Sequence, residues 1–158
     1  MLNFTPTQTT GVYNLTLDGA ITENIEFKGE VPAGAIAVDV QCSKISRINS
    51  MGITKWILFF RELRKRGVNL RYFDLPVSVV NLCNFVSGMV EPGEVQSLHL
   101  PFFCERCNTE TEVLRTVESL RTLMKNPEFT LDPITCPNCK TPAAFDGVPK
   151  NFLDFLIP

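Results

Sequence analysis

The feature that most constrains this chain is a set of four cysteines arranged as two C-x-x-C pairs. The first pair is Cys104 and Cys107, and the second is Cys136 and Cys139. Each pair can present two sulfurs from one tight turn, and two such turns can surround a metal ion tetrahedrally at Zn–S distances of about 2.3 Å. Thiolates are soft ligands that favour zinc or an iron centre over magnesium or calcium. The spacing therefore predicts a metal site made of these four side chains.

The donor set favours a structural Zn²⁺ ion over a catalytic one. Four thiolates leave no open coordination position, and the one histidine, His99, has no second histidine to join it. We interpret His99 as a sheet residue. A redox dithiol, a rubredoxin-like iron site and disulfides are the alternatives, although a reducing cytosol disfavours disulfides. With no P-loop and no dinucleotide glycine motif in the sequence, we assign no catalytic residue and expect a protein that is not an enzyme.

The segment that carries the cysteines reads as a small module of its own. The two pairs are separated by 28 residues, whereas a zinc ribbon usually has about 15–20 between them. We expect the excess to form a hairpin or helix within residues 111–124. Residues 91–158 carry ten acidic and six basic side chains, and so small a core is marginal without metal–thiolate bonds. We predict a zinc-ribbon-like module over residues 94–158, with its apolar C-terminal segment docked on the first domain.

The first 93 residues alternate strand-like and helix-like patterns. Residues 2–5 can pair as a hairpin with the next strand, and the nearly continuous apolar run at residues 35–40 is typical of a strand buried on both faces. Residues 22–34 hold two glycines and a proline, which argues against a long helix there. The other expected elements are strands at residues 12–18, 68–73 and 95–100, an amphipathic helix at 50–66 with Ser50 as N-cap and Gly67 after its end, and a helix opened by Pro76. This order predicts an α/β fold class, a mixed sheet with helices packed on it, over residues 1–93.

The stretch from Asp39 to Gly88 resembles the STAS domain, the sulphate-transporter and anti-sigma-factor-antagonist fold. The likeness rests on the order of a buried strand, a segment similar to the family's D-S-S/T-G-L helix start, a helix, a strand and a second helix. The helix start reads Ile45-Ser46-Arg47-Ile48-Asn49-Ser50-Met51-Gly52-Ile53, and the helix ends in Arg64-Lys65-Arg66-Gly67. Upstream, Leu15-Thr16-Leu17-Asp18-Gly19 is similar to the family's second strand and glycine. The resemblance covers about residues 1–100.

The resemblance implies a partner-binding turn at residues 49–53. In antagonist members of the family, the serine after the motif's aspartate is phosphorylated by a partner kinase, and the added charge releases the partner. Ser50 falls on that serine and Gly52 on the motif's glycine. Two positions depart from the pattern, because Asn49 stands for the aspartate and Met51 for a small polar residue. A phosphate on a helix-start hydroxyl would meet the positive end of the helix.

The function that we expect is non-enzymatic, regulatory and cytoplasmic. The chain would bind a protein partner, a kinase or another signalling protein, through turn 49–53 and the helix after it. A net charge of −2 and a pI near 5.4 disfavour nucleic-acid binding through bulk positive charge. The longest apolar run, residues 56–60, is far too short to span a membrane. The alternatives are a nucleic-acid-binding zinc ribbon and a redox or metal sensor, and open sheet edges would allow a homodimer.

Overall fold

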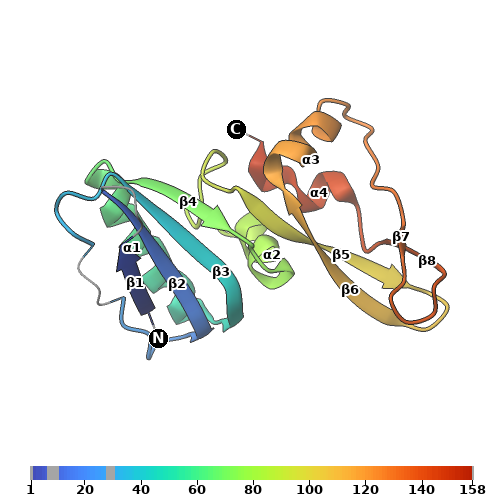
Figure 1. Ribbon diagram of the computed structural model, residues 1–158, viewed down its shortest axis with the longest axis horizontal. Coiled ribbons are helices and arrows are strands. Elements are labelled where there is room, and N and C mark those ends of the chain that lie inside the picture. Colours follow the sequence, from blue (N-terminus) through green and yellow to red (C-terminus); the bar gives the residue numbers. More distant parts are fainter. Residues whose placement is uncertain (1, 7–10, 28–30, 158) are drawn as a thin grey trace.

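The computed structural model describes residues 2–6, 11–27 and 31–157, and within them the fold is mixed α/β with two sheets (Figure 1). The first sheet contains β1 (Leu2–Pro6), β2 (Val12–Ile21), β3 (Ala37–Ile48) and β4 (Asn69–Phe73). The second contains β5 (Ser97–Cys104), β6 (Thr109–Thr116), β7 (Ile134–Thr135) and β8 (Pro142–Phe145). The helices are α1 (Ser50–Lys65), α2 (Val77–Phe85), α3 (Val117–Met124) and α4 (Pro149–Phe152), followed by a 3-10 helix, η1 (Asp154–Leu156).

The first sheet has the strand order β1-β2-β3-β4. The predicted hairpin is confirmed, because β1 runs antiparallel to β2 with Leu2 opposite Leu17. β2, β3 and β4 are parallel, so the β3–α1–β4 unit forms the predicted crossover. α1 packs on the sheet through buried residues that include Trp56 and Phe60. The Trp56 ring stacks on Tyr72 of β4 with centroids 5.7 Å apart.

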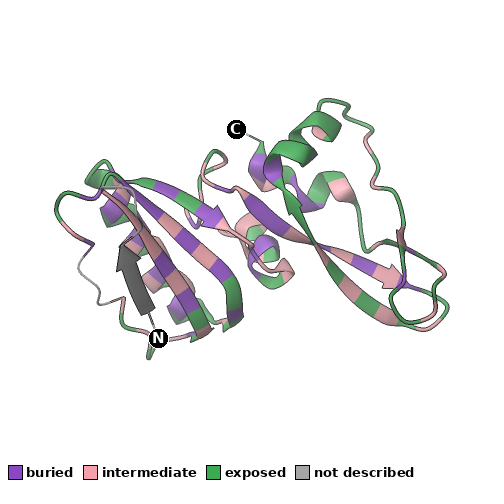
Figure 2. Ribbon diagram, viewed as in Figure 1, coloured by how far each residue is buried: buried purple, intermediate pink, exposed green. Residues whose placement is uncertain are grey.

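The prediction that the strand beginning near residue 35 is buried on both faces is wrong. Val38, Val40 and Cys42 are fully buried on the α1 side, but Asp39 lies on the opposite face and pairs with Arg71 of β4 at 2.5 Å. Figure 2 shows this alternation of burial along β3. The strand is also longer than predicted. Beyond residue 41 its register with β2 shifts, and β3 continues to Ile48. A helix on one face is enough to cover the apolar side of the sheet, because the other face carries polar side chains that can meet water.

The start of α1 differs from the prediction by one residue. Asn49, not Ser50, is the N-cap, and its Oδ1 accepts a hydrogen bond from the Gly52 N–H at 2.8 Å. Ser50 is the first helical residue and its side chain is exposed. Asparagine and serine are equally good caps, so the choice depends on which residue the preceding strand leaves extended. The other end is as predicted, with Gly67 at a φ of 75° after the last turn.

Lys55 and Arg64 of α1, and Arg66 at its C-cap, hold neighbouring loops against the helix. The Lys55 Nζ donates to the Ile25 carbonyl at 2.9 Å, and the Arg66 guanidinium donates to the Val31 carbonyl at 2.9 Å. Arg64 forms a two-point ion pair with Glu94 at 2.6 and 2.7 Å. These side chains therefore hold the turns that border the helix, and only part of the basic helix end is a solvated face.

β5 links the two sheets. The segment that leads into β5 lies parallel to β4 and the residues after it, with single bridges at Tyr72–Val95 and Leu75–Leu98. Beyond them β5 pairs antiparallel with β6 and β8 in the second sheet, whose order is β6-β5-β8-β7. The backbone hydrogen bonds between β4 and β5 cross the boundary predicted at residues 93 and 94. The division into two domains stays a prediction.

The region between the cysteine pairs contains β6 and then α3, so the expected helix or hairpin is present. The C-terminal segment, α4 with η1, contacts α2. Asn84 of α2 donates to the Phe152 carbonyl at 2.9 Å and accepts from the Phe155 N–H at 3.1 Å. Phe145 lies between Phe102 and Phe152, with ring centroids 5.9 and 5.6 Å away. Among the helices that the structure describes, none is long and apolar enough to cross a membrane.

Candidate metal centre and the 49–53 turn

The four cysteines of the two pairs meet at one end of the second sheet. Cys104 is the last residue of β5, and Cys107 precedes β6. Cys136 follows β7, and Cys139 precedes β8. Their Sγ atoms all lie within 4.8 Å of one another. The predicted set is therefore brought together in a cluster that is compatible with a metal site.

Both pairs sit on knuckles with the same backbone shape. We call residues 104–107 the first knuckle and residues 136–139 the second. The next residue has a positive φ in each case, 54° at Asn108 and 63° at Lys140. Its N–H closes the knuckle on the carbonyl of the pair's first cysteine, at 2.8 Å for Cys104 and 3.1 Å for Cys136. A left-handed lysine is strained by about 1 kcal/mol or more, and such strain persists where the surroundings require it.

Hydroxyl groups set the electrostatics of the cluster. The Thr109 Oγ1 lies 3.0 Å from the Cys107 Sγ, and this contact is the main reason that the pKa of Cys107 falls to about 6. The Thr141 Oγ1 lies 2.9 Å from the Cys139 Sγ and 3.5 Å from the Cys104 Sγ. The Thr141 contact, followed by the Cys107 backbone N–H, lowers the pKa of Cys104. A lowered pKa favours the thiolate, which is the form that binds a metal.

Cys136 behaves differently from these two thiols. Its hydrogen bond from the Cys139 backbone N–H favours the thiolate, but burial and the neighbouring Cys107 and Cys104 thiols outweigh that bond, so the pKa of Cys136 is raised. Four thiols packed this closely cannot all ionise without a cation among them, because like charges repel. A cation among the sulfurs would favour the fully ionised set, so the cluster is compatible with a metal site.

The sequence reasoning missed Thr109 and Thr141. A signal for them was present, since both knuckles continue into the same pattern, C-x-x-C-x-T. His99, in contrast, lies in β5 with its Nδ1 3.9 Å from the Glu112 carboxylate. It is not part of the cysteine cluster.

The 49–53 turn is a separate site. Figure 1 shows the knuckles at the end of the second sheet that lies farthest from the first sheet, so the structure does not join them to the start of α1. Asn49, Ser50 and Met51 are exposed, and Met51 has 54% of its surface accessible. Gly52 is buried against β2, where an added Cβ would lie 2.1 Å from the Ile21 carbonyl oxygen. The turn thus presents three side chains to solvent and needs a glycine at the fourth position.

Glu23 gives a physical reason for the asparagine at position 49. The Asn49 Nδ2 donates to the Glu23 carboxylate at 2.7 Å, and this bond is the main cause of the lowered pKa of Glu23. An aspartate at position 49 would replace the donor with a second carboxylate and so would repel Glu23. Asn49 caps the helix with its oxygen and holds the neighbouring loop with its nitrogen.

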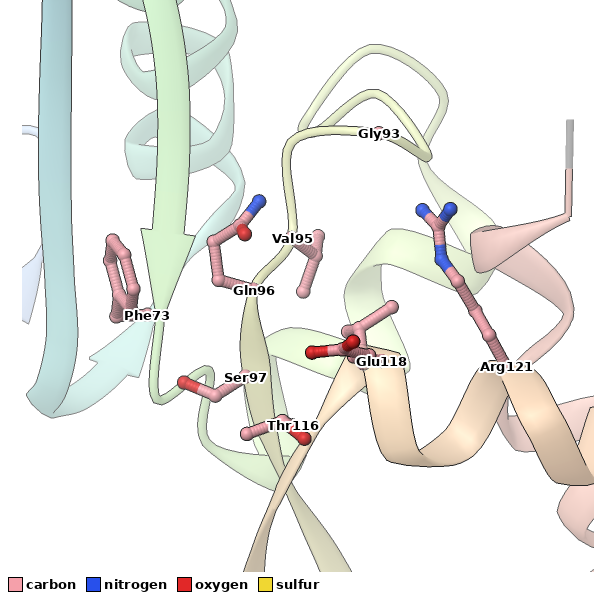
Figure 3. Close-up of a pocket in the computed structure, with 9 residues that line it drawn as sticks. Phe73, Gly93, Val95, Gln96, Ser97, Thr116, Glu118 and Arg121 are labelled. Carbon is pink, nitrogen blue, oxygen red and sulfur yellow. The ribbon is translucent and has the colours of Figure 1, made fainter.

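A hollow of about 520 Å³ lies where the two sheets meet. Phe73, Val95 and Gln96 line one side, and Glu118 and Arg121 of α3 line the other (Figure 3). The one serine on its wall, Ser97, is 6% exposed. Its Oγ donates to the Asp74 carboxylate at 2.7 Å and accepts from the Asp74 N–H at 2.8 Å. This hydroxyl therefore holds the β4–β5 junction together and is not free for chemistry.

Comparison with protein-family models, curated proteins and solved structures finds no match to this chain. The STAS resemblance therefore stays a prediction from the sequence pattern of residues 39–88. The identity of the ion likewise stays a prediction from the four sulfur donors.

Proposed function

We propose that the protein is a non-enzymatic regulatory protein with a STAS-like sheet, which binds a protein partner and carries a structural zinc ion on its four clustered cysteines. The observation that carries the proposal is the convergence of the four Sγ atoms within 4.8 Å. Six free cysteines, two of them outside the cluster, fit a reducing compartment. We accordingly place the protein in the cytoplasm.

The spacing of the sulfurs supports zinc. Four Zn–S bonds of about 2.3 Å in a tetrahedron place the sulfurs about 3.8 Å apart. Two pairs across the knuckles, Cys104–Cys139 at 3.4 Å and Cys107–Cys136 at 3.6 Å, are slightly closer than this, so small outward movements would admit the ion. A complete thiolate set leaves no position for substrate, which makes the role structural. Metal–thiolate bonds would also stabilise a short β7–β8 hairpin whose first strand has two residues.

The start of α1 supports the partner-binding role. The parallel β3–α1–β4 unit and the close approach of Gly52 to the end of β2 fit the order of elements that the resemblance implies. Ser50 is exposed at the first position of a 16-residue helix, where a phosphate would be stabilised by free N–H groups and the helix dipole. A bulky apolar Met51 beside it supplies a contact that a partner could cover. We propose Ser50 as the modification site and a kinase or another signalling protein as the partner.

A redox or metal sensor is the second candidate, because Cys107 is only half-buried and its pKa is about 6. Low-pKa, accessible thiolates oxidise readily. Nucleic-acid binding by the ribbon is disfavoured, since Glu105, Glu110 and Glu112 are exposed at or near the first knuckle and would repel phosphate.

The metal role is tested by elemental analysis of protein purified without chelator. We expect one zinc per chain in the wild type and in Cys83→Ala, a control outside the cluster, and none in Cys104→Ser or Cys139→Ser. The two serine variants should also lose the cooperative unfolding of the second sheet. Metal-free wild-type protein would contradict the proposal. Metal that leaves under mild peroxide with formation of a disulfide would instead favour the sensor.

The partner role is tested by affinity capture with the wild type, Ser50→Glu and Met51→Asp. Ser78→Glu, which places the same charge on an exposed serine of α2, is the matched control. We expect a protein that is captured by the wild type and by Ser78→Glu but lost with the two turn variants. Equal capture by all four chains would argue against turn 49–53 as the binding surface.

A further inference from the structure

The two cysteines of each pair receive hydrogen bonds from different sources. The first cysteine accepts a hydrogen bond from a backbone N–H group. The Cys107 N–H donates to the Cys104 sulfur, and the Cys139 N–H donates to the Cys136 sulfur. The sulfur of the second cysteine contacts the hydroxyl of the threonine two residues later in the chain. Those contacts measure 3.0 Å from Cys107 to Thr109 and 2.9 Å from Cys139 to Thr141. The division is the same in both knuckles, except that the Thr141 hydroxyl also lies 3.5 Å from the Cys104 sulfur.

The direction of the threonine hydrogen bonds is fixed once a metal is bound. A metal-bound thiolate has no proton to give, so the hydroxyl must be the donor. Thr109 is already arranged for this, since its oxygen accepts a hydrogen bond from the Asn138 side chain at 3.4 Å. Asn138 belongs to the second knuckle, so a chain of donors runs from Asn138 through Thr109 to Cys107. This chain connects one knuckle to the other.

Thr141 makes a second connection between the knuckles. Besides its contact with Cys139, its hydroxyl oxygen lies 3.5 Å from the Cys104 sulfur in the first knuckle. Thr109 and Thr141 are both only half-buried, so neither is needed to fill a core. Their common property is a hydroxyl placed beside a sulfur.

We propose that Thr109 and Thr141 are positioning residues of the metal site, whose hydroxyls donate to the thiolates of Cys107 and Cys139. This inference rests on the proposed metal site. Four thiolates around Zn²⁺ carry a net charge of −2, and two O–H donors spread that charge over the surrounding protein. The hydroxyls thereby tighten metal binding and lower the nucleophilicity of the sulfurs. Loss of such outer donors typically costs 10–100-fold in metal affinity.

The test uses Thr109→Val and Thr141→Val, which keep the branched shape and remove the hydroxyl, together with Thr109→Ser and Thr141→Ser, which restore it. Thr135→Val is the matched control, because Thr135 adjoins Cys136 and is exposed. Zinc affinity is measured by competition with a chromophoric chelator. The sulfur-to-metal charge-transfer band of the Co²⁺-loaded protein reports the donor strength of the sulfurs, and iodoacetamide reports their reactivity.

We expect each valine variant to bind zinc about 10-fold more weakly, to shift the Co²⁺ band and to be alkylated faster. Both serine variants and Thr135→Val should stay close to the wild type. Valine variants that match Thr135→Val in affinity and band position would overturn the inference while leaving the metal site intact. Wild-type protein that binds no zinc would overturn the proposed function itself. If Thr141→Val fails to fold, Thr109→Val, in the edge strand β6, decides the question.

Discussion

Replacement of Gly52 by alanine tests how the start of α1 is held against the first sheet. The added Cβ would lie 2.1 Å from the Ile21 carbonyl oxygen and 2.6 Å from its carbonyl carbon, where ordinary contact begins at 3.4 Å. The obstacle is backbone, and the same oxygen accepts a hydrogen bond from the Asn49 N–H at 3.2 Å. The Ile21 carbonyl and the Asn49 N–H are both backbone groups and cannot rotate away as a side chain would. The helix start must therefore move away from the end of β2.

The size of the effect follows from two opposing terms. Overpacking of this kind destabilises a fold by about 1–3 kcal/mol, and a rigid backbone obstacle places Gly52→Ala near the upper end. In the opposite direction, alanine stabilises a helix by up to about 1 kcal/mol relative to glycine. We therefore expect a net loss of about 2 kcal/mol in the free energy of unfolding, which reduces the ratio of folded to unfolded protein about 30-fold.

The assay is urea unfolding followed by tryptophan fluorescence. Trp56 is the single tryptophan, is fully buried and lies on α1 itself. A slope near 2 kcal/mol per M converts the expected loss to a midpoint shift of about 1 M. Gly34→Ala is the control, because an added Cβ there meets no atom within 4 Å. A midpoint for Gly52→Ala within about 0.2 M of the wild type, or an equal shift for Gly34→Ala, would refute the reasoning.

Three further predictions concern other contacts of the fold. Asn84→Ala removes both hydrogen bonds to the C-terminal segment and should destabilise that segment locally by about 1–2 kcal/mol. We expect faster hydrogen exchange at residues 149–157. The control Asn81→Ala, at an exposed position, should show no such change. The lowered pKa of Glu23 implies stability that is present above its ordinary pKa of 4.5 and is lost as the pH falls through the lower folded value. The stability difference between the wild type and Glu23→Leu should therefore shrink on acidification below about pH 4, and a constant difference would contradict the Asn49–Glu23 contact. Removal of the proposed zinc by a chelator should add four rapidly alkylated cysteines in mass spectrometry. Cys83, whose burial raises its pKa to about 12, should stay unmodified in the folded protein. Labelling of Cys83 before the cluster would be inconsistent with this fold.

Much of the architecture could be predicted because it depends on local patterns. The apolar spacing of α1 and its glycine stop need only neighbouring residues, and the C-x-x-C pairs fix two sulfurs on each tight turn. A strand followed by a helix and another strand leaves little choice but a parallel crossover. These features, and the meeting of the four sulfurs, could be inferred without knowledge of distant contacts.

The parts that could not be predicted depend on contacts between residues far apart in the chain. Whether Asn49 or Ser50 caps α1 is settled by the Ile21 carbonyl, which binds the Asn49 N–H and holds that residue extended. The cations of α1 and of its C-cap bind carbonyl groups and a carboxylate about 30 positions away. The burial of β3 depends on which face of the sheet a helix covers. Pattern and spacing carry no information on any of these choices.

The position of β5 has a practical consequence for dissecting the protein. A fragment that stopped at residue 93 would remove the groups that bond to the backbone of Tyr72 and Leu75. It would leave a bare strand edge, which is a template for self-association. A fragment that continued through Leu100 would keep that edge covered while omitting every cysteine of the cluster. Shortened versions of the chain intended for crystallisation or for NMR should therefore end beyond the last β4–β5 contact, several residues after the boundary predicted at residues 93 and 94.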